Sequence, residues 1–248
     1  MSRLQYVLRL ADTSLILAQR LGEWIGHAPA LEEDLALANI GLDLLGQARI
    51  LLTYAGEIEG RGRDENALAY LRSEMEFVNA QLVEQPNGDF GFTIVRQVLI
   101  DAFQLELYER LSGSSDARLA EFAAKAVKET SYHFRYSAGW LIRLGDGTAE
   151  SRKRVQVALD TLWPFTRELF EADAVDAEMQ AAGVAPNLSE VHGAWSVRMA
   201  EVLAEATLTQ PPDTPFLWQG KRGQHSEHLG HVLTQLQYLQ RAYPGATW

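Results

Sequence analysis

The chain of 248 residues has no cysteine, and its 22 Lys and Arg residues are outnumbered by 33 Asp and Glu residues. Without cysteine it has no disulfide, no thiolate nucleophile and no thiolate ligands for an iron–sulfur cluster. The net charge of −11 argues against nucleic-acid binding and against docking on anionic lipid. The first residues lack a signal-peptide core, and no uncharged apolar run is long enough for a membrane span. We therefore expect a cytoplasmic protein with no nucleic-acid or membrane partner.

Hydrophobic residues recur at helical spacing almost throughout, and no segment alternates like a strand. Pro164 predicts a kink or break near Trp163, and a Pro-rich stretch over 209–223 is expected to be irregular. We expect one all-α domain, 1–248, in which two long hairpins form a ferritin-like four-helix bundle with additional flanking helices. The expected helices cover residues 4–26, 31–56, 65–84, 90–112 and 116–144, a sixth begins after Thr148, a seventh after Asn187, and the last covers 224–241.

Four acids on four expected helices follow the order of a ferritin-like di-iron site, which is acid, acid-x-x-His, acid, acid-x-x-His. They are Asp12, Asp43, Asp101 and Glu129. The two histidine positions instead hold Gly46 and Tyr132. These six residues therefore look like degenerate di-iron positions, and we expect no catalytic residue and no metal in this chain. The alternative from spacing alone is four unrelated acids, some exposed and some in salt bridges.

The helical neighbours of the four acids are largely apolar, so we expect inward-facing carboxylates that form a buried polar network between the two hairpins. His133 lies four residues after Glu129, one position beyond the ligand slot. Because a helix turns by about 100° per residue, this offset is expected to point its ring away from the site.

Longer stretches carry a more specific pattern than the four acids. They are residues 21–29 (LGEWIGHAP), 34–49, 82–88 (LVEQPNG), 128–129 with 132–133, and 227–230 with 238–241. Together they resemble the C subunit of the bacterial phenylacetyl-CoA epoxidase, the multicomponent oxygenase of aerobic phenylacetate breakdown. The resemblance extends over essentially the whole chain.

The resemblance implies a division of labour. A separate catalytic subunit of the same complex would carry the di-iron centre, and a reductase with flavin and an iron–sulfur cluster would deliver electrons from NADPH. This chain would be a ferritin-like structural subunit without a cofactor, which binds the catalytic subunit, binds other members of the oxygenase and forms a homodimer when alone. The resemblance does not fix the stoichiometry, the contact surface or the choice between phenylacetyl-CoA and a related aryl-acyl-CoA.

A second candidate site lies before the last expected helix. Lys221 and Arg222 form a small basic loop next to His225 and His228, and such a loop at a helix start can hold an anion or meet a partner. The alternative is ordinary packing.

Two other functions stay open at this point. One is a di-iron oxidase or iron-binding protein that uses the four acids with His133, and the other is a scaffold for a different oxygenase. Trp195 and Trp218 are candidates for partner contacts, with core packing as the alternative.

Overall fold

The structure is a computed structural model that describes residues 1–246, so the last two positions of the expected domain lie outside the described residues. No strand occurs in residues 1–246, which confirms the all-α class. The fold divides into two compact units: Met1–Pro86 with the chain from Trp218 onward, and Asn87–Leu217. The expectation of one domain stays a prediction.

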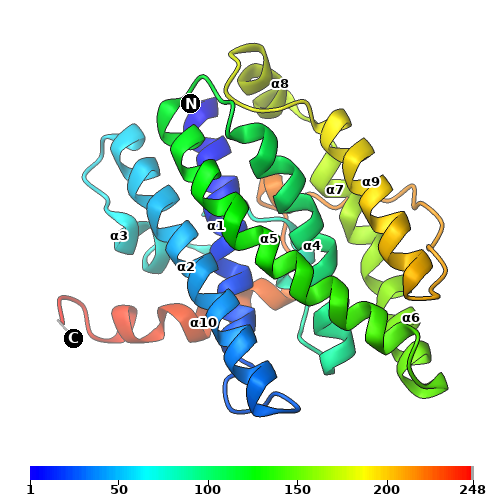
Figure 1. The fold of residues 1–248 in the computed structure, drawn as a ribbon. Helices are drawn as coiled ribbons and strands as arrows, with labels where there is room; N and C mark the ends of the chain where they lie inside the picture. Colours follow the sequence, from blue (N-terminus) through cyan, green and yellow to red (C-terminus); the bar gives the residue numbers. More distant parts are fainter. Residues whose placement is uncertain (247–248) are drawn as a thin grey trace. The chain divides into compact units, whose positions relative to one another are not determined.

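The first unit is built on the hairpin of α1 (Ser2–Gly22) and α2 (Leu31–Glu59), which lie side by side and antiparallel (Figure 1). Acids at positions 32–34 complement the dipole at the start of α2. Gly60 ends the helix in the left-handed conformation, with φ of 66°. The remaining elements of this unit are α3 (Glu65–Tyr70), η1 (Glu74–Glu76), η2 (Gln81–Glu84), η4 (Gly220–Arg222) and α10 (Glu227–Ala242).

The helix expected over residues 65–84 is wrong, because α3 ends at Tyr70 and only two short 3₁₀ turns follow. The backbone after Tyr70 bonds to α1 instead of continuing the helix. Val78 donates its N–H to the Asp12 carboxylate (3.1 Å), and Ala80 donates to the Thr13 hydroxyl (3.3 Å). Tertiary bonds thus override the helical pattern of the segment.

The second unit is built on the hairpin of α4 (Phe90–Leu111) and α5 (Ala117–Gly145), against which α6 (Ala149–Leu162) and α9 (Leu188–Glu205) pack. The expected break near Trp163 is confirmed, because α6 passes into η3 (Trp163–Thr166) and then α7 (Arg167–Phe170). Helix α8 (Ala174–Ala181) was missed, although Asp173 and Asp176 form its capping box. The other expected helices agree with the structure to within a few residues.

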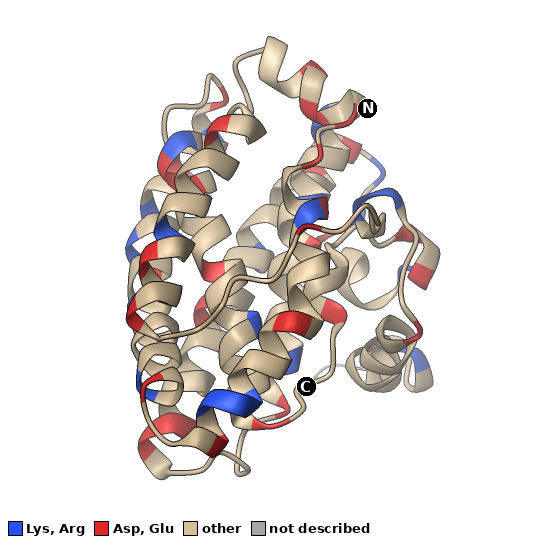
Figure 2. Ribbon diagram, turned by 90° about the vertical axis from the view of Figure 1, so that its right-hand side faces the viewer, with Lys and Arg blue, Asp and Glu red and all other residues tan. Residues whose placement is uncertain are grey.

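Charged residues of both signs are interspersed along the helices (Figure 2). Several oppositely charged pairs lie four residues apart, including Glu106 with Arg110, Lys125 with Glu129, and Glu150 with Arg154. Pairs at this spacing contribute about 0.2–0.5 kcal/mol each to a helix. The stability of both units must therefore come mainly from their buried apolar faces.

Candidate functional site

Asp12, the first of the four acids, is fully buried in α1 and is bound by an arginine. Arg72 Nη1 lies 3.0 Å from Asp12 Oδ2, and Nη2 bonds to Oδ1, so the contact is bidentate. Val78 donates its backbone N–H to Oδ2 as well (3.1 Å). Both carboxylate oxygens therefore have partners from the same unit.

The arginine itself is held firmly in place. Only 1% of Arg72 is exposed, and its guanidinium donates to the carbonyls of Leu68 (2.5 Å) and Glu76 (3.1 Å). The group also lies over the Phe77 ring, 4.2 Å from the centroid. A positive charge fixed on both oxygens of Asp12 would repel a metal cation there, and breaking the pair would leave a buried charge.

Asp43 and Gly46 lie on α2 in the same unit, and both are half-buried. A Cβ atom built on Gly46 would meet nothing within 4 Å. The missing histidine at this position is therefore not explained by lack of space at the backbone.

Asp101, in α4 of the second unit, is also fully buried. Gln97 Nε2 donates to its Oδ1 (2.8 Å), and the Ser137 hydroxyl on α5 donates to its Oδ2 (2.7 Å). Burial raises the pKa of Asp101 to about 6, although the charge of His133 and these two hydrogen bonds act in the opposite direction. This carboxyl group can therefore take up a proton near neutral pH.

On α5, the residues that face the interior differ from those expected from the sequence. Tyr132 is 41% exposed, and the side chain of Glu129 is 20% exposed and lies 3.4 Å from Lys125. His133 is fully buried, together with Thr130 and Ser137. The buried stripe of α5 is rotated by about one residue from the assumed one, so His133 lies on the buried face and Tyr132 does not.

The structure gives Asp12 and Asp101 separate partners, none of which is another of the four acids. Among residues 1–246, no three His, Asp or Glu side chains gather as metal ligands. Two imidazoles are missing and Asp12 is engaged by Arg72, so the residues do not fit a di-iron centre of the ferritin-like type. The absence of metal from this chain stays a prediction that metal analysis can test.

The structure places the residues of the second candidate site in different surroundings. His225 has a side chain that is only 1% exposed, and its Nδ1 lies 2.6 Å from Glu84 Oε1 while its Nε2 lies 2.8 Å from the Phe77 carbonyl. Both ring nitrogens are therefore used inside the first unit, and His225 is not open to an anion. His228 donates its backbone N–H to Ser226, the N-cap of α10 (3.3 Å). Anion binding by Lys221 and Arg222 stays a prediction.

Glu84 is the centre of a polar cluster that the sequence did not reveal. It is fully buried and accepts hydrogen bonds from Asn79 Nδ2 (2.9 Å), the Ser226 hydroxyl (2.6 Å) and the Ser226 N–H (2.8 Å). Burial lowers the pKa of His225, but the hydrogen bond and charge of Glu84 outweigh it, so the net pKa is raised. This cluster fastens the start of α10 to the segment after α3.

The second unit also contains an aromatic cavity of about 450 Å³, lined partly by Trp163, Phe170, His192 and Trp195. Trp195 is 2% exposed and donates its Nε1–H to the Leu99 carbonyl (3.1 Å). Its role is therefore core packing and not partner contact. Trp218 is half-buried.

The comparisons with known proteins are consistent with this geometry. The family model described as phenylacetic acid catabolic protein matches residues 1–248. The chain is 52% identical to the C subunit of 1,2-phenylacetyl-CoA epoxidase from Escherichia coli (strain K12) over 243 residues, 98% of each chain. A solved Synechococcus protein with aldehyde deformylating oxidase activity is 17% identical, with a TM-score of 0.55 over 82% of this chain and 92% of that one. This last likeness shows the fold alone, and it confirms the ferritin-like class.

Proposed function

The chain belongs to the phenylacetic acid catabolic protein family, and from that premise we propose that it is a non-catalytic structural subunit. Its complex would be the multicomponent di-iron oxygenase that epoxidises the aromatic ring of phenylacetyl-CoA. The 52% identity to the epoxidase relative from Escherichia coli supports the choice of complex.

The observation that carries the non-catalytic role is the buried pair of Asp12 and Arg72. A ferritin-like di-iron site uses an acid from this helix as a ligand. In this chain the guanidinium of Arg72 binds that acid in place of a metal ion. The two positions where such a site has histidine hold Gly46 and Tyr132. The iron would therefore lie in the partner that performs catalysis, and flavin, the iron–sulfur cluster and NADPH would act in the reductase.

Iron loading tests this role directly. The purified chain is loaded anaerobically with Fe(II), desalted and analysed for iron by elemental analysis. We expect no stoichiometric iron, because nitrogen ligands of the kind such sites use are missing from the two histidine positions. About two irons per chain, with an oxo-bridge absorption band after exposure to oxygen, would support the alternative of an independently active di-iron oxidase.

A reconstitution assay tests the structural role. The catalytic subunit with its reductase should epoxidise phenylacetyl-CoA when this chain is present and lose most activity without it. The variant Glu129→Gln should leave turnover largely intact, because Glu129 is partly exposed and paired with Lys125. An assembled complex that is inactive with this variant would show that the chain takes part in the chemistry.

A further inference from the structure

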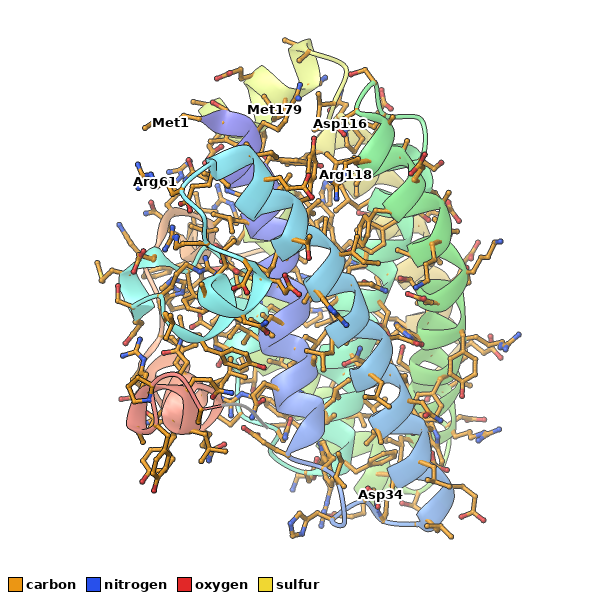
Figure 3. All side chains as sticks on the ribbon, turned by 90° about the vertical axis from the view of Figure 1, so that its left-hand side faces the viewer. Met1, Asp34, Arg61, Asp116, Arg118 and Met179 are labelled. Carbon is orange, nitrogen blue, oxygen red and sulfur yellow. The ribbon has the colours of Figure 1, made fainter. Side chains whose placement is uncertain are left out.

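Helix α2 carries large aliphatic side chains on its outer face. Leu31, Leu35, Leu42 and Leu45 are 69%, 57%, 64% and 45% exposed, and Ile50 is 39% exposed. Single exposed apolar residues are common, but a row of them along one helix marks an interaction surface. We call these five residues the outer row of α2. In Figure 3 the label Asp34 marks the first turn of this helix, and the label Arg61 marks the loop just after its end.

The four leucines of the outer row have the spacing of a helix–helix seam. With the half-buried Ala38 between Leu35 and Leu42, they follow one another at steps of four, three, four and three residues, and Ile50 lies five residues beyond Leu45, outside this register. This alternation is the a/d pattern with which two helices interlock as knobs into holes. The inner face of α2 has its own buried row, made of Leu37, Ile40, Leu44 and Leu51. Helix α2 therefore has two apolar faces: the inner row is packed inside the first unit, and the outer row is exposed.

The outer row is also poor in charge. Between Leu35 and Ala48 the only charged residue is Asp43. Glu32, Glu33 and Asp34 stand at the beginning of the helix and Arg49 near the end of the row, so residues 31–50 carry four acids and one base. The face is thus an apolar centre with a net acidic margin.

A lipid bilayer is a poor occupant of this face. By length and composition, α2 is the one helix among the described residues that could cross a membrane, but 39% of that apolar window is buried inside the structure. Its inner row is already used against the rest of the first unit, including α1 and α3. Its acidic margin would also be repelled by anionic lipid.

A second copy of the chain is disfavoured by charge. Two copies joined along α2 would bring together two acidic margins on chains that each carry a net charge of −11. A helix with a matching leucine-type row and basic residues on its flanks would satisfy both the apolar centre and the acidic margin.

We propose that the outer row of α2 is the surface on which a helix of the catalytic subunit packs. The inference rests on the proposed function for the identity of the partner, and it adds the place of contact and the chemistry of the partner helix. That helix carries an apolar row at a/d spacing and Lys or Arg residues opposite Glu32 to Asp34.

The absence of cysteine allows a site-specific test. Leu42→Cys places one thiol in the outer row, and Val197→Cys places one at a 62% exposed apolar position of α9 as a control. Each variant is labelled with a maleimide, alone and with saturating amounts of the catalytic partner, and the modification of this chain is followed by mass spectrometry. We expect labelling at position 42 to slow at least about tenfold in the complex, as for a buried interface centre, and labelling at position 197 to keep its rate.

A second experiment measures the affinity of this chain for the catalytic subunit. Leu42→Arg should weaken binding to the catalytic subunit by roughly tenfold or more, as expected for a central anchor, and Val197→Arg should not. Circular dichroism checks that each variant is folded, and Leu42→Gln replaces the arginine variant if that one is not.

The possible outcomes separate the two proposals. A wild-type complex that forms while position 42 labels at its free rate overturns the surface and leaves the proposed function standing. No complex with the catalytic subunit overturns both. Slower labelling at position 42 with rising concentration of this chain alone, or with anionic vesicles, identifies a second copy or a membrane as the occupant and overturns the proposal.

Discussion

Replacing Asp101 with Asn should stabilise the protein at neutral pH. Asp101 is fully buried, and burial raises its pKa from an ordinary value of 3.8 to about 6. At pH values above 6 the folded state must hold an ionised carboxylate away from water, whereas the unfolded chain solvates it. A shift of roughly two pKa units corresponds to about 3 kcal/mol of destabilisation.

The dependence on pH has a definite sign. Below about pH 3.8 both states hold the proton, and the group has no effect on stability. As the pH rises from 3.8 to 6, the folded state holds a proton that the unfolded state has lost, so the free energy of unfolding falls. Above pH 6 the loss is complete. The asparagine amide can still accept from Gln97 and donate to Ser137, whose hydroxyl lies 3.3 Å from the Phe134 carbonyl and can donate there.

The assay is urea unfolding of the wild type and Asp101→Asn across pH 4 to 8. We expect the variant to gain up to about 3 kcal/mol relative to the wild type between the two ends of this range. Asp146→Asn is the control, because it removes the same charge from a side chain that is 68% exposed. A variant that loses stability equally at every pH would show that Asp101 is a stably ionised partner of His133 and would refute the reasoning.

Three further changes test two other buried polar groups and the two positions that lack histidine. Arg72→Met should cost about 3–5 kcal/mol because it leaves the Asp12 carboxylate buried and unpaired, and adding Asp12→Asn should recover much of that loss in urea unfolding. His225→Gln should destabilise the protein most below pH 6.5, with a gap that narrows as the pH rises through the raised pKa of His225; an unchanged gap at pH 9 would contradict the assignment. Gly46→His with Tyr132→His should gain no stoichiometric iron by elemental analysis, because Arg72 still engages Asp12 and position 132 lies at the surface.

Most of the helices could be predicted from the sequence because residues next to their ends form local hydrogen bonds that mark where a helix begins. Asp89, Asp116 and Asn187 all cap helices through their side chains, and such caps precede apolar periodic segments that can be read directly. The segment after Tyr70 could not be read in this way. Its helical composition is overruled by hydrogen bonds to residues 66 and 67 positions earlier in the chain, and no local sequence pattern predicts these bonds.

The candidate site was predicted in part for a similar reason. The identities of the residues at positions 46 and 132 show directly that two histidines are absent. The spacing of residues along α5 does not determine which of them face the interior. A helix stripe about 100° wide moves to a different set of residues after a rotation of one position, so Glu129 and Tyr132 were assigned to the face that His133 and Ser137 occupy. The partners of Asp12 and Glu84 come from distant parts of the chain, namely Arg72 and His225.

Asp12 and Asp101 illustrate two ways in which a helical protein can supply partners to a buried carboxyl group. Asp12 is paired with a fixed guanidinium, so both of its oxygens are already engaged by Arg72. Asp101 accepts hydrogen bonds from the neutral donors Gln97 and Ser137, which only partly offset the burial of its ionised form above pH 6. A metal at the first position would have to displace Arg72. Because this cost adds to the two missing imidazoles, we expect a di-iron centre in this chain to be disfavoured by more than the loss of two ligands alone.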